Sequence, residues 1–378
     1  MRPIKVDYII SAVTTGQAGT EGHVFRLVRG LDRSRVTPRI ITLQDSPAMQ
    51  GWNDSTTPLL SLGFTSFKSF SAPRAVFRLA RLLRANQTDI AELYFTDAHL
   101  IGAVAARLAG TKAVISCRRN LAYQYGRKER LLSRLGNPGV HVFLANSLEV
   151  IRHIARVEKL SEDRFRTISN GVDLDTFDAE SRFAVSEAVR TRLSGRKCVA
   201  LLANLRPVKN VQMFLTAAYY VLQEFPETVF LVMGAGPDEE SLKRYALELE
   251  IGDHVVWAGS APAPAAYLRH CVLGVLTSNS EGFSNAILEY MAAGLPVVAT
   301  RVGGASEAIE DSRTGFLIEP GDFASLAGFI QRYLRDDNLR VSHGSAGRAK
   351  VEREFTFSAM LGRYYALYEE LSPGLSRQ

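Results

Sequence analysis

Cysteine is scarce in this 378-residue sequence, and its three copies, Cys117, Cys198 and Cys271, are far apart. An odd number of widely spaced cysteines predicts neither a disulfide framework nor a C-x-x-C metal site. No apolar run approaches the roughly 18 residues that cross a bilayer. Asp7 interrupts the short apolar run at the N-terminus and no small-residue cleavage site follows, so this stretch predicts a first strand rather than a signal peptide. We therefore expect a protein of the reducing cytoplasm.

Several well-known functional signatures are also missing. The sequence contains no Gly-x-Ser-x-Gly elbow, no P-loop, no His-Glu-x-x-His and no clustered metal ligands. No helix-turn-helix, zinc or ribonucleoprotein signature accompanies its basic residues, which argues against nucleic acid as a partner. No predicted strand is followed by a complete G-x-G-x-x-G and an acidic residue, which disfavours a nicotinamide oxidoreductase.

Short β-branched runs alternate with helical patterns over most of the chain. These runs are VDYII, RIITL, AVISC, VFLAN, CVALLAN, TVFLVMG, HVVWAG, LGVLTS, PVVAT and GFLIE. They are apolar throughout, as in strands that are buried on both faces of a parallel sheet. Alternating strands and helices predict right-handed βαβ units, and the length predicts two domains. We therefore predict an α/β protein with two doubly wound, Rossmann-like domains.

The domain boundary is predicted from a polar segment at about residues 178–196, which precedes a fresh strand and ends in a Ser-Gly break. We expect an N-terminal domain over residues 1–178 and a C-terminal domain over residues 179–354. The final pattern, FTFSAMLGRYYALYEEL, predicts an aromatic amphipathic helix with no strand after it. This helix must pack on a domain that is already built.

The formal net charge of +6 is unevenly distributed. Residues 1–180 hold 25 Lys and Arg against 17 Asp and Glu, whereas residues 181–378 hold 20 against 22. The first half is therefore expected to face an acidic partner, such as a membrane surface or an anionic substrate. Arginines at helical spacing over residues 74–84 fit a basic amphipathic helix that could rest on anionic lipid, and a solvated helix face is the alternative.

Two glutamates stand eight residues apart in EGFSNAILEYMAAGLPVVATRVGG, residues 281–304. Glu281 follows a predicted strand, where open α/β sheets bind ligands. Ser284 is predicted to cap a helix that runs to about Ala293, carries Glu289, and offers free N–H groups to a phosphate. A nucleotide sugar would suit this arrangement, with one carboxylate for sugar hydroxyls, the amides for the diphosphate and the second carboxylate for the ribose. The alternative is a glutamate that favours the helix dipole and another that is solvated.

Two cations, Arg206 and Lys209, lie in NLRPVKN, residues 204–210, directly after the predicted strand CVALLA. In a loop at the carboxyl end of a strand, both could reach one diphosphate. Lysine and arginine are also common in loops that bind nothing, so this alternative stays open.

Two glycine-containing loops follow other predicted strands. In GAGPDEESL, residues 234–242, the first two glycines permit a tight strand-to-helix turn, but the dinucleotide fingerprint is not met because position 239 is Glu. In TTGQAGTEGH, residues 14–23, three glycines would let the backbone approach a phosphate or a sugar. A plain turn and a flexible loop are the alternatives. The glycines of the second loop are Gly16, Gly19 and Gly22.

Together these motifs resemble the family-4 retaining glycosyltransferases of the GT-B fold, over nearly the whole chain. The most specific part is the E-x7-E of Glu281 and Glu289 with EGFS, AAGLPVVAT and GG. Supporting parts are NLRPVK, GAGP, SNGVDLDTF at residues 169–177 and the terminal Phe/Tyr-rich helix. The resemblance implies two Rossmann-like domains that face a central cleft, with the last helix, residues 355–375, returning to the N-terminal domain.

The resemblance also implies roles for individual residues. In relatives the first Glu contacts the donor sugar and the second holds the ribose, which implies these roles for Glu281 and Glu289. Loop cations neutralise the departing diphosphate, which implies that role for Arg206 and Lys209. No metal or other cofactor is then expected, and no protein nucleophile, because retention in this family is explained by front-face attack. The other residues expected to bind the donor are Gly19, Thr20, Asn204, Gly234, Gly236, Gly282, Phe283, Ser284 and Asn285.

Two positions depart from the family pattern. Many relatives place the first cation directly after a Gly, five residues before the Lys; here that position is Asn204, and Arg206 lies two residues later. Many also have a sugar-positioning His after the strand that AVISC matches, where this chain has Cys117 and Arg118. His99, after the strand AELYF, is a candidate for that role, and a loop histidine without a catalytic role is the alternative.

We therefore expect a metal-independent hexosyltransferase that moves a sugar from a nucleotide sugar, with UDP as the expected nucleotide. The acceptor is expected to be a glycan or a lipid-linked glycan in polysaccharide or glycoconjugate biosynthesis. A nucleotide-sugar epimerase of the same fold is one alternative, and it would consume the donor without an acceptor. A catalytically idle glycan-binding or scaffold protein is another. Peripheral contact with the inner face of an anionic membrane is an open expectation.

Overall fold

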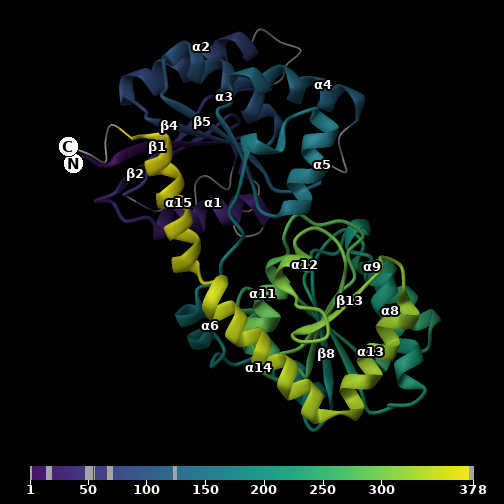
Figure 1. The fold of residues 1–378 in the computed structure, drawn as a ribbon. Helices are drawn as coiled ribbons and strands as arrows, with labels where there is room; N and C mark the ends of the chain where they lie inside the picture. The colour runs from purple at the N-terminus through teal and green to yellow at the C-terminus, as the bar shows by residue number, and fades with distance from the viewer. Residues whose placement is uncertain are drawn as a thin grey trace. The chain divides into compact units, whose positions relative to one another are not determined.

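The computed structural model describes residues 2–13, 19–46, 54, 56–65, 71–121 and 126–373. The chain forms two compact units, one of Met1–Ile168 with Leu361–Gln378 and the other of Ser169–Met360. Each unit contains its own parallel sheet with helices on both faces (Figure 1). The predicted α/β fold with two doubly wound sheets is confirmed. Across the described residues, no helix is both long enough and apolar enough to span a bilayer.

The first unit is built on a parallel sheet with the strand order β3-β2-β1-β4-β5-β6-β7. Its strands are β1 (Ile4–Ile10), β2 (Val36–Thr42), β3 (Leu59–Ser61), β4 (Ile90–Tyr94), β5 (Ala113–Arg118), β6 (Val142–Ala145) and β7 (Phe165–Thr167). Its helices are α1 (Gly19–Gly30), α2 (Ser71–Asn86), α3 (Thr96–Ala109), α4 (Arg127–Gly136) and α5 (Leu148–Glu158), with the 3-10 turns η2 (Asn137–Gly139) and η3 (Glu162–Arg164). The connections from β3 to β7 all run in one direction, so right-handed crossovers place α2 to α5 on one face of the sheet and α1 on the other.

The second unit is built on a parallel sheet with the strand order β10-β9-β8-β11-β12-β13. Its strands are β8 (Cys198–Leu202), β9 (Val229–Met233), β10 (Val255–Gly259), β11 (Leu273–Leu276), β12 (Val297–Thr300) and β13 (Gly315–Ile318). Its helices are α6 (Leu174–Glu180), α7 (Glu187–Leu193), α8 (Val211–Leu222), α9 (Glu239–Glu248), α10 (Pro264–Leu268), α11 (Asn285–Ala292), α12 (Ala305–Ala308), α13 (Phe323–Arg335) and α14 (Asp337–Glu354), with η4 (Pro207–Lys209) and η5 (Gly252–His254).

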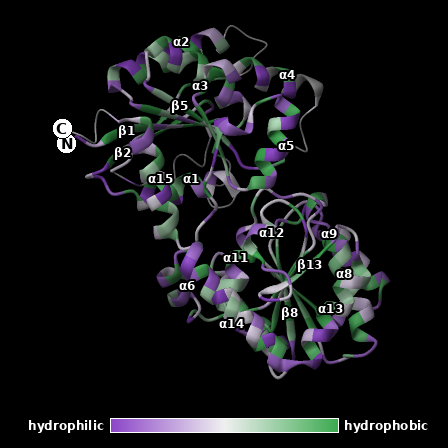
Figure 2. Cartoon of the chain, viewed as in Figure 1, coloured by the Kyte–Doolittle hydropathy of each residue, from purple (hydrophilic) through white to green (hydrophobic). Residues whose placement is uncertain are grey.

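Alternate residues of the central strands in the second sheet face two separate cores. Cys198 and Ala200 of β8 lie in a cluster with Met291 of α11. Val199 and Leu201 point the other way, into the cluster beneath α8 and α13. The strands of both sheets are predominantly hydrophobic (Figure 2). This burial on both faces is what their uniformly apolar runs predicted.

The last helix, α15 (Phe357–Leu371), packs its C-terminal part on the first unit. The Tyr368 hydroxyl donates a hydrogen bond to Oε2 of Glu92 at 2.6 Å, and the Tyr8 hydroxyl lies 2.8 Å from that of Tyr368. Glu92 is fully buried, and this burial raises the pKa of its carboxyl. The predicted return of the helix to the N-terminal domain is confirmed.

The chain passes between the units after Ile168 and again after Met360, whereas the predicted boundaries lie at residues 178 and 354. The segment after Ile168 is held by the second unit, since the Val172 N–H donates to the Phe355 carbonyl at 2.9 Å. The polar stretch in which we placed the domain boundary contains α7 and the end of α6, and apolar residues of both helices join the core of the second unit. Short amphipathic helices of this kind resemble linkers in composition.

Candidate functional site

The strand order of the second sheet brings two distant loops together. The chain leaves β8 toward β9 on one side and later returns to β11 on the other side of β8. This reversal is the topological switch point, where open α/β sheets bind ligands beyond the carboxyl ends of their strands. Lys209 lies in the loop after β8, and Glu281 lies in the loop after β11. The two residues thus flank the switch point.

Lys209 and Glu281 form an ion pair there. Nζ of Lys209 donates a hydrogen bond to Oε1 of Glu281, and Oγ of Ser278 donates to the same oxygen at 2.6 Å. The side chains of Lys209 and Glu281 are 21% and 11% exposed, so the pair is shielded but reachable from solvent. Within the described part of the chain, Oε2 of Glu281 has no hydrogen-bond partner. The pair therefore presents an unshared carboxylate oxygen beside an ammonium group.

Hydrogen bonds of backbone and side-chain groups fix the two loops against each other. Oγ1 of Thr277 donates to the Lys209 carbonyl at 2.9 Å, and the Asn279 N–H donates to the Val208 carbonyl at 2.8 Å. Asn210, which follows Lys209, has a φ of 45° and its side-chain amide donates to Oδ1 of Asn279 at 3.2 Å. These bonds hold the backbone of the ion pair in place.

Two glycines after β12 support the loop that carries Glu281. Gly303 has a φ of 54°, and a Cβ added there would lie 2.4 Å from the Glu281 carbonyl oxygen. The Gly304 N–H donates to the Gly282 carbonyl at 2.8 Å, and a Cβ at 304 would lie 2.2 Å from the Phe283 ring. Sequence reasoning assigned these glycines no role, although two adjacent glycines at the carboxyl end of a strand are a signal of close backbone approach.

Helix α11 begins where the sequence predicted. Ser284 occupies the N-cap position, but within the described region its side chain makes no capping hydrogen bond. Oδ1 of Asn285 accepts a hydrogen bond from Nδ2 of Asn170 at 2.6 Å. The sequence analysis did not place Asn170 near the site. Glu289 lies in the second turn of the helix and is partly buried. The first N–H groups of an α-helix have no intrahelical partner, so this terminus can accept an anion.

The loop that carries the cations also contains exposed side chains. Arg206 is exposed at the start of η4, and no carboxylate of the described residues forms an ion pair with it. Asn204 is exposed as well. The loop after β9 requires its two glycines for packing against the loop after β8. A Cβ at Gly234 would lie 1.8 Å from the Ala203 carbonyl oxygen, and a Cβ at Gly236 would lie 2.3 Å from the Leu205 carbonyl oxygen. Close approach of two backbones thus accounts for glycine at both positions, and the assignment of Gly234 and Gly236 to the donor stays a prediction.

The predicted donor residues of the first unit lie at the start of α1. Gly19 has a φ of 62° and is the first residue of the helix, followed by Thr20, which is partly exposed. Gly16 belongs to residues 14–18, which lie outside the described part of the chain. The assignment of Gly19 and Thr20 to the donor stays a prediction.

His99 is not available for the role that we considered. It is fully buried in the first unit, with Nδ1 2.9 Å from Oγ of Ser116 and Nε2 2.8 Å from the Ser133 carbonyl oxygen. Burial, together with the nearby charge of Arg118, lowers the pKa of His99 to about 3, so the ring is neutral at physiological pH. Since both ring nitrogens are engaged inside the protein, we withdraw His99 from the candidate site.

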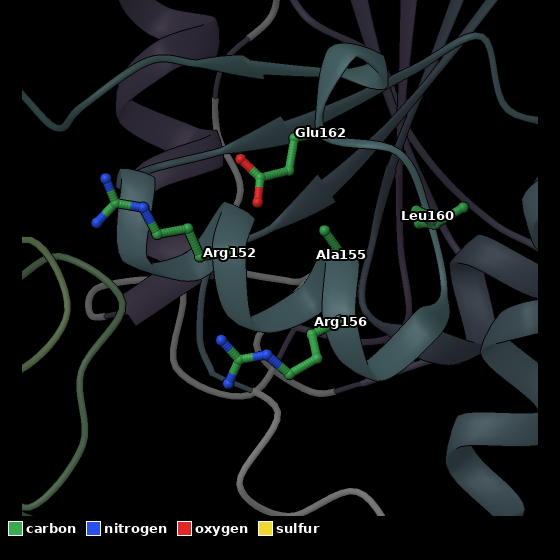
Figure 3. A pocket seen from close by; sticks show the side chains of 5 residues that line it. All are labelled: Arg152, Ala155, Arg156, Leu160 and Glu162. Atoms are coloured by element: carbon green, nitrogen blue, oxygen red, sulfur yellow. The ribbon is translucent and has the colours of Figure 1, made fainter.

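Two further features bear on ligands. Among the described residues, no group of three or more His, Cys, Asp or Glu side chains is arranged to hold a metal ion. An open pocket of about 400 Å³ lies on the surface of the first unit, beside α5 (Figure 3). It is lined by Arg152, Ala155, Arg156, Leu160 and Glu162, and it contains none of the predicted site residues.

Two protein families match the sequence. Residues 186–350 match the family described as Glycosyl transferases group 1, and residues 18–176 match Glycosyltransferase Family 4. The first match contains Lys209, Glu281 and Glu289. The two matches follow one another along the chain, as the two sheets do.

Curated relatives include several sugar transferases. N-acetyl-alpha-D-glucosaminyl L-malate synthase of Bacillus anthracis is 28% identical over 246 residues, which are 64% of this chain and 62% of that protein. GDP-mannose-dependent alpha-(1-6)-phosphatidylinositol monomannoside mannosyltransferase of Mycolicibacterium smegmatis is 32% identical over 189 residues, which are 47% of this chain and 49% of that protein. The chain thus matches less than two thirds of the length of either protein. UDP-Gal:alpha-D-GlcNAc-diphosphoundecaprenol alpha-1,3-galactosyltransferase of Escherichia coli is 24% identical over 310 residues, 79% of each chain.

Solved structures show a similar fold. HepE of Anabaena in complex with UDP-glucose matches with a TM-score of 0.81 at 18% identity, over 99% of this chain and 100% of that chain. Sucrose-phosphate synthase from Thermosynechococcus elongatus matches with a TM-score of 0.81 at 18% identity, over 98% and 100%. At such identities the likeness concerns the fold, which is that of the GT-B glycosyltransferases.

Proposed function

Because the chain belongs to the family-4 glycosyltransferases of the GT-B fold, we propose that it transfers a sugar from a nucleotide sugar to a glycan or lipid-linked acceptor, with retention of configuration. The observation that carries this proposal is the Lys209–Glu281 ion pair at the switch point of the second sheet. A cation beside a carboxylate with one unshared oxygen suits a donor that carries both phosphates and hydroxyls. UDP is the proposed nucleotide, in line with the UDP-glucose bound by HepE.

Each residue of the site has a part in the proposed reaction. Lys209 and Arg206 neutralise the diphosphate, together with the first N–H groups of α11. Glu281 accepts a hydrogen bond from a sugar hydroxyl, and Glu289 accepts one from the ribose. As the bond between the anomeric carbon and the phosphate oxygen breaks, negative charge grows on the leaving diphosphate, and fixed cations and amides stabilise it. The acceptor hydroxyl attacks the anomeric carbon on the same face and its proton passes to the leaving phosphate. We propose no metal in this reaction.

An acceptor-dependence assay tests the proposal. The purified chain is incubated with UDP-sugars or with GDP-mannose, in the presence and absence of lipid-linked glycan acceptors, and the released nucleoside diphosphate is measured. A transferase releases the diphosphate only when a suitable acceptor is present. Conversion of the donor sugar without an acceptor and without diphosphate release would identify an epimerase. Donor binding without turnover under any condition would identify an idle protein and contradict transfer.

The proposed partners include an anionic membrane, which the exposed faces of α2, α3 and α4 suit. On α2, the exposed arginines and Phe77 recur at spacings of three or four residues and so form one stripe along the helix. This helix contains no acidic residue. Phe77 is 65% exposed, and Leu131 and Leu135 of α4 are 60% and 63% exposed. The α2–α4 surface comprises Arg74, Phe77, Arg78, Arg81, Arg84, Val104, Arg107, Leu108, Arg130, Leu131, Arg134 and Leu135.

The chemistry of the α2–α4 surface is that of an interfacial binding site. Arg78 and Arg84 donate to backbone carbonyls, those of Leu62 and Leu108, and in the described structure the arginines of α2 form no ion pair with a carboxylate. Their charge is therefore open to lipid phosphates, while the apolar side chains between them can enter the headgroup region. Such contact would bring the enzyme to a lipid-linked acceptor at the cytoplasmic face of the membrane.

Reversing two charges on α2 is expected to weaken membrane binding. Arg74→Glu with Arg81→Glu should lower partitioning onto vesicles of phosphatidylcholine and phosphatidylglycerol by about tenfold or more, because each cation near an anionic surface contributes to binding. Flotation of the protein with the vesicles measures this partitioning. The matched control, Arg182→Glu with Arg244→Glu, makes the same change in net charge on the second unit. Equal losses in the two variants, or equal wild-type binding to pure phosphatidylcholine, would contradict the proposed contact.

A further inference from the structure

Ser278 lies two residues beyond the end of β11 and is fully buried. Its Oγ donates a hydrogen bond to Oε1 of Glu281 at 2.6 Å, and its carbonyl accepts one from Oγ1 of Thr300 at 2.7 Å. The preceding residue, Thr277, donates to the Lys209 carbonyl at 2.9 Å. Two consecutive residues at the end of one strand thus hold both members of the ion pair, and Thr300 from the next strand holds Ser278.

Both hydrogen bonds to the Glu281 side chain go to the same carboxylate oxygen. Oε1 receives both the Lys209 ammonium and the Ser278 hydroxyl, whereas Oε2 receives no bond from the described residues. A carboxylate can accept on both oxygens, so Oε2 is the acceptor left for a ligand. The ammonium of Lys209 likewise has two further N–H donors beyond the one it gives to Glu281.

We infer that Ser278 is a positioning residue that fixes Glu281 so that Oε2 faces the donor sugar. This inference rests on the proposed function, because it assigns Glu281 to a sugar hydroxyl. When a diphosphate binds the Lys209 ammonium, the hydrogen bond from Ser278 still holds Oε1 of Glu281. A charge-assisted O–H···O⁻ bond is among the stronger hydrogen bonds, and it spares the carboxylate a reorientation when the donor arrives. Ser278 itself is expected to touch neither the nucleotide nor the sugar.

Substitution of Ser278 with alanine tests the inference. We expect Ser278→Ala to lower kcat/KM for the nucleotide sugar by about tenfold, the size of effect that loss of one hydrogen bond to a charged group produces. Affinity for the nucleoside diphosphate alone should stay at the wild-type value, because that ligand carries no sugar hydroxyl for Glu281 to bind and the substitution leaves the charges of Lys209 and Glu281 unchanged. The matched control is Ser280→Ala, in the same loop, where no hydrogen bond of the hydroxyl is present among the described residues. It should leave both quantities unchanged.

Comparison of kcat/KM for the nucleotide sugar with affinity for the nucleoside diphosphate distinguishes a positioning role of Ser278 from general damage to the fold. Equal losses of diphosphate affinity and of kcat/KM in Ser278→Ala, with a lower melting temperature, would overturn the inference in favour of a purely structural role. Wild-type kcat/KM in this variant would overturn it as well. If the wild-type chain itself binds no nucleotide sugar, the proposed function fails and the inference fails with it. An active wild-type enzyme that tolerates Ser278→Ala refutes the inference alone.

Discussion

Lys209→Ala is expected to lower kcat/KM for sugar transfer by about 10²- to 10³-fold, the range typical of losing one group that stabilises a developing negative charge. The ammonium lies at the switch point of the second sheet, largely shielded from solvent, where its field is less screened than that of a surface lysine. The variant also leaves Glu281 as an uncompensated, mostly buried carboxylate that repels the diphosphate. Steady-state kinetics with the preferred donor and acceptor measure the loss.

A matched lysine serves as the control for this variant. Lys243 lies on α9, pairs with Glu239 and Glu240 on the helix surface, and has no proposed part in the reaction. Lys243→Ala should keep wild-type kinetics. Retention of most of the activity in Lys209→Ala, with an intact fold by circular dichroism, would contradict the assignment of Lys209 to the leaving group.

Glu281→Gln is expected to separate sugar recognition from diphosphate binding. Transfer should fall by about a hundredfold, because the neutral amide replaces a charged acceptor for a sugar hydroxyl. Affinity for the nucleoside diphosphate should rise, since the charge of Lys209 is then no longer offset by its partner. The two changes have opposite signs, which general damage to the fold could not produce. Titration with the diphosphate and steady-state kinetics on the same preparation measure both.

The control for Glu281→Gln is Glu248→Gln. Glu248 is an exposed residue of α9 and belongs to neither of the two site loops. It should alter neither quantity. Weaker diphosphate binding in Glu281→Gln, or full transfer activity, would show that Glu281 does not act on the donor sugar as proposed.

The fold could be predicted because its strands are buried on both faces. Runs such as CVALLAN and TVFLVMG leave no polar face, and only a parallel sheet covered by helices on both sides accommodates several of them in one domain. The edge strand β3 (Leu59–Ser61) could not be found in this way, since it is short and only partly buried. The boundary after Ile168 was missed because α6 and α7 are short, polar helices that resemble a linker in composition.

The candidate site could be predicted only as a set of loops. Lys209 and Glu281 each follow an apolar run, which placed both at carboxyl ends of strands. Their contact depends on the pairing of β8 with β11, and strand order cannot be read from periodicity. Ser278 and Asn170 went unnoticed because small polar residues are common in loops, and only the folded chain supplies their partners. His99 follows a strand too, but its side chain turns inward, a direction that spacing does not reveal.

The roles proposed for the site all require that the second unit binds the nucleotide of a sugar donor through the loop of Lys209. Calorimetric titration of the purified protein with UDP, GDP and ADP, without added metal and beside Lys209→Ala, tests it most directly. We expect micromolar binding of one nucleotide, UDP, and weaker binding of that nucleotide by the variant. Absence of binding to all three nucleotides, or binding that Lys209→Ala leaves unchanged, would contradict it.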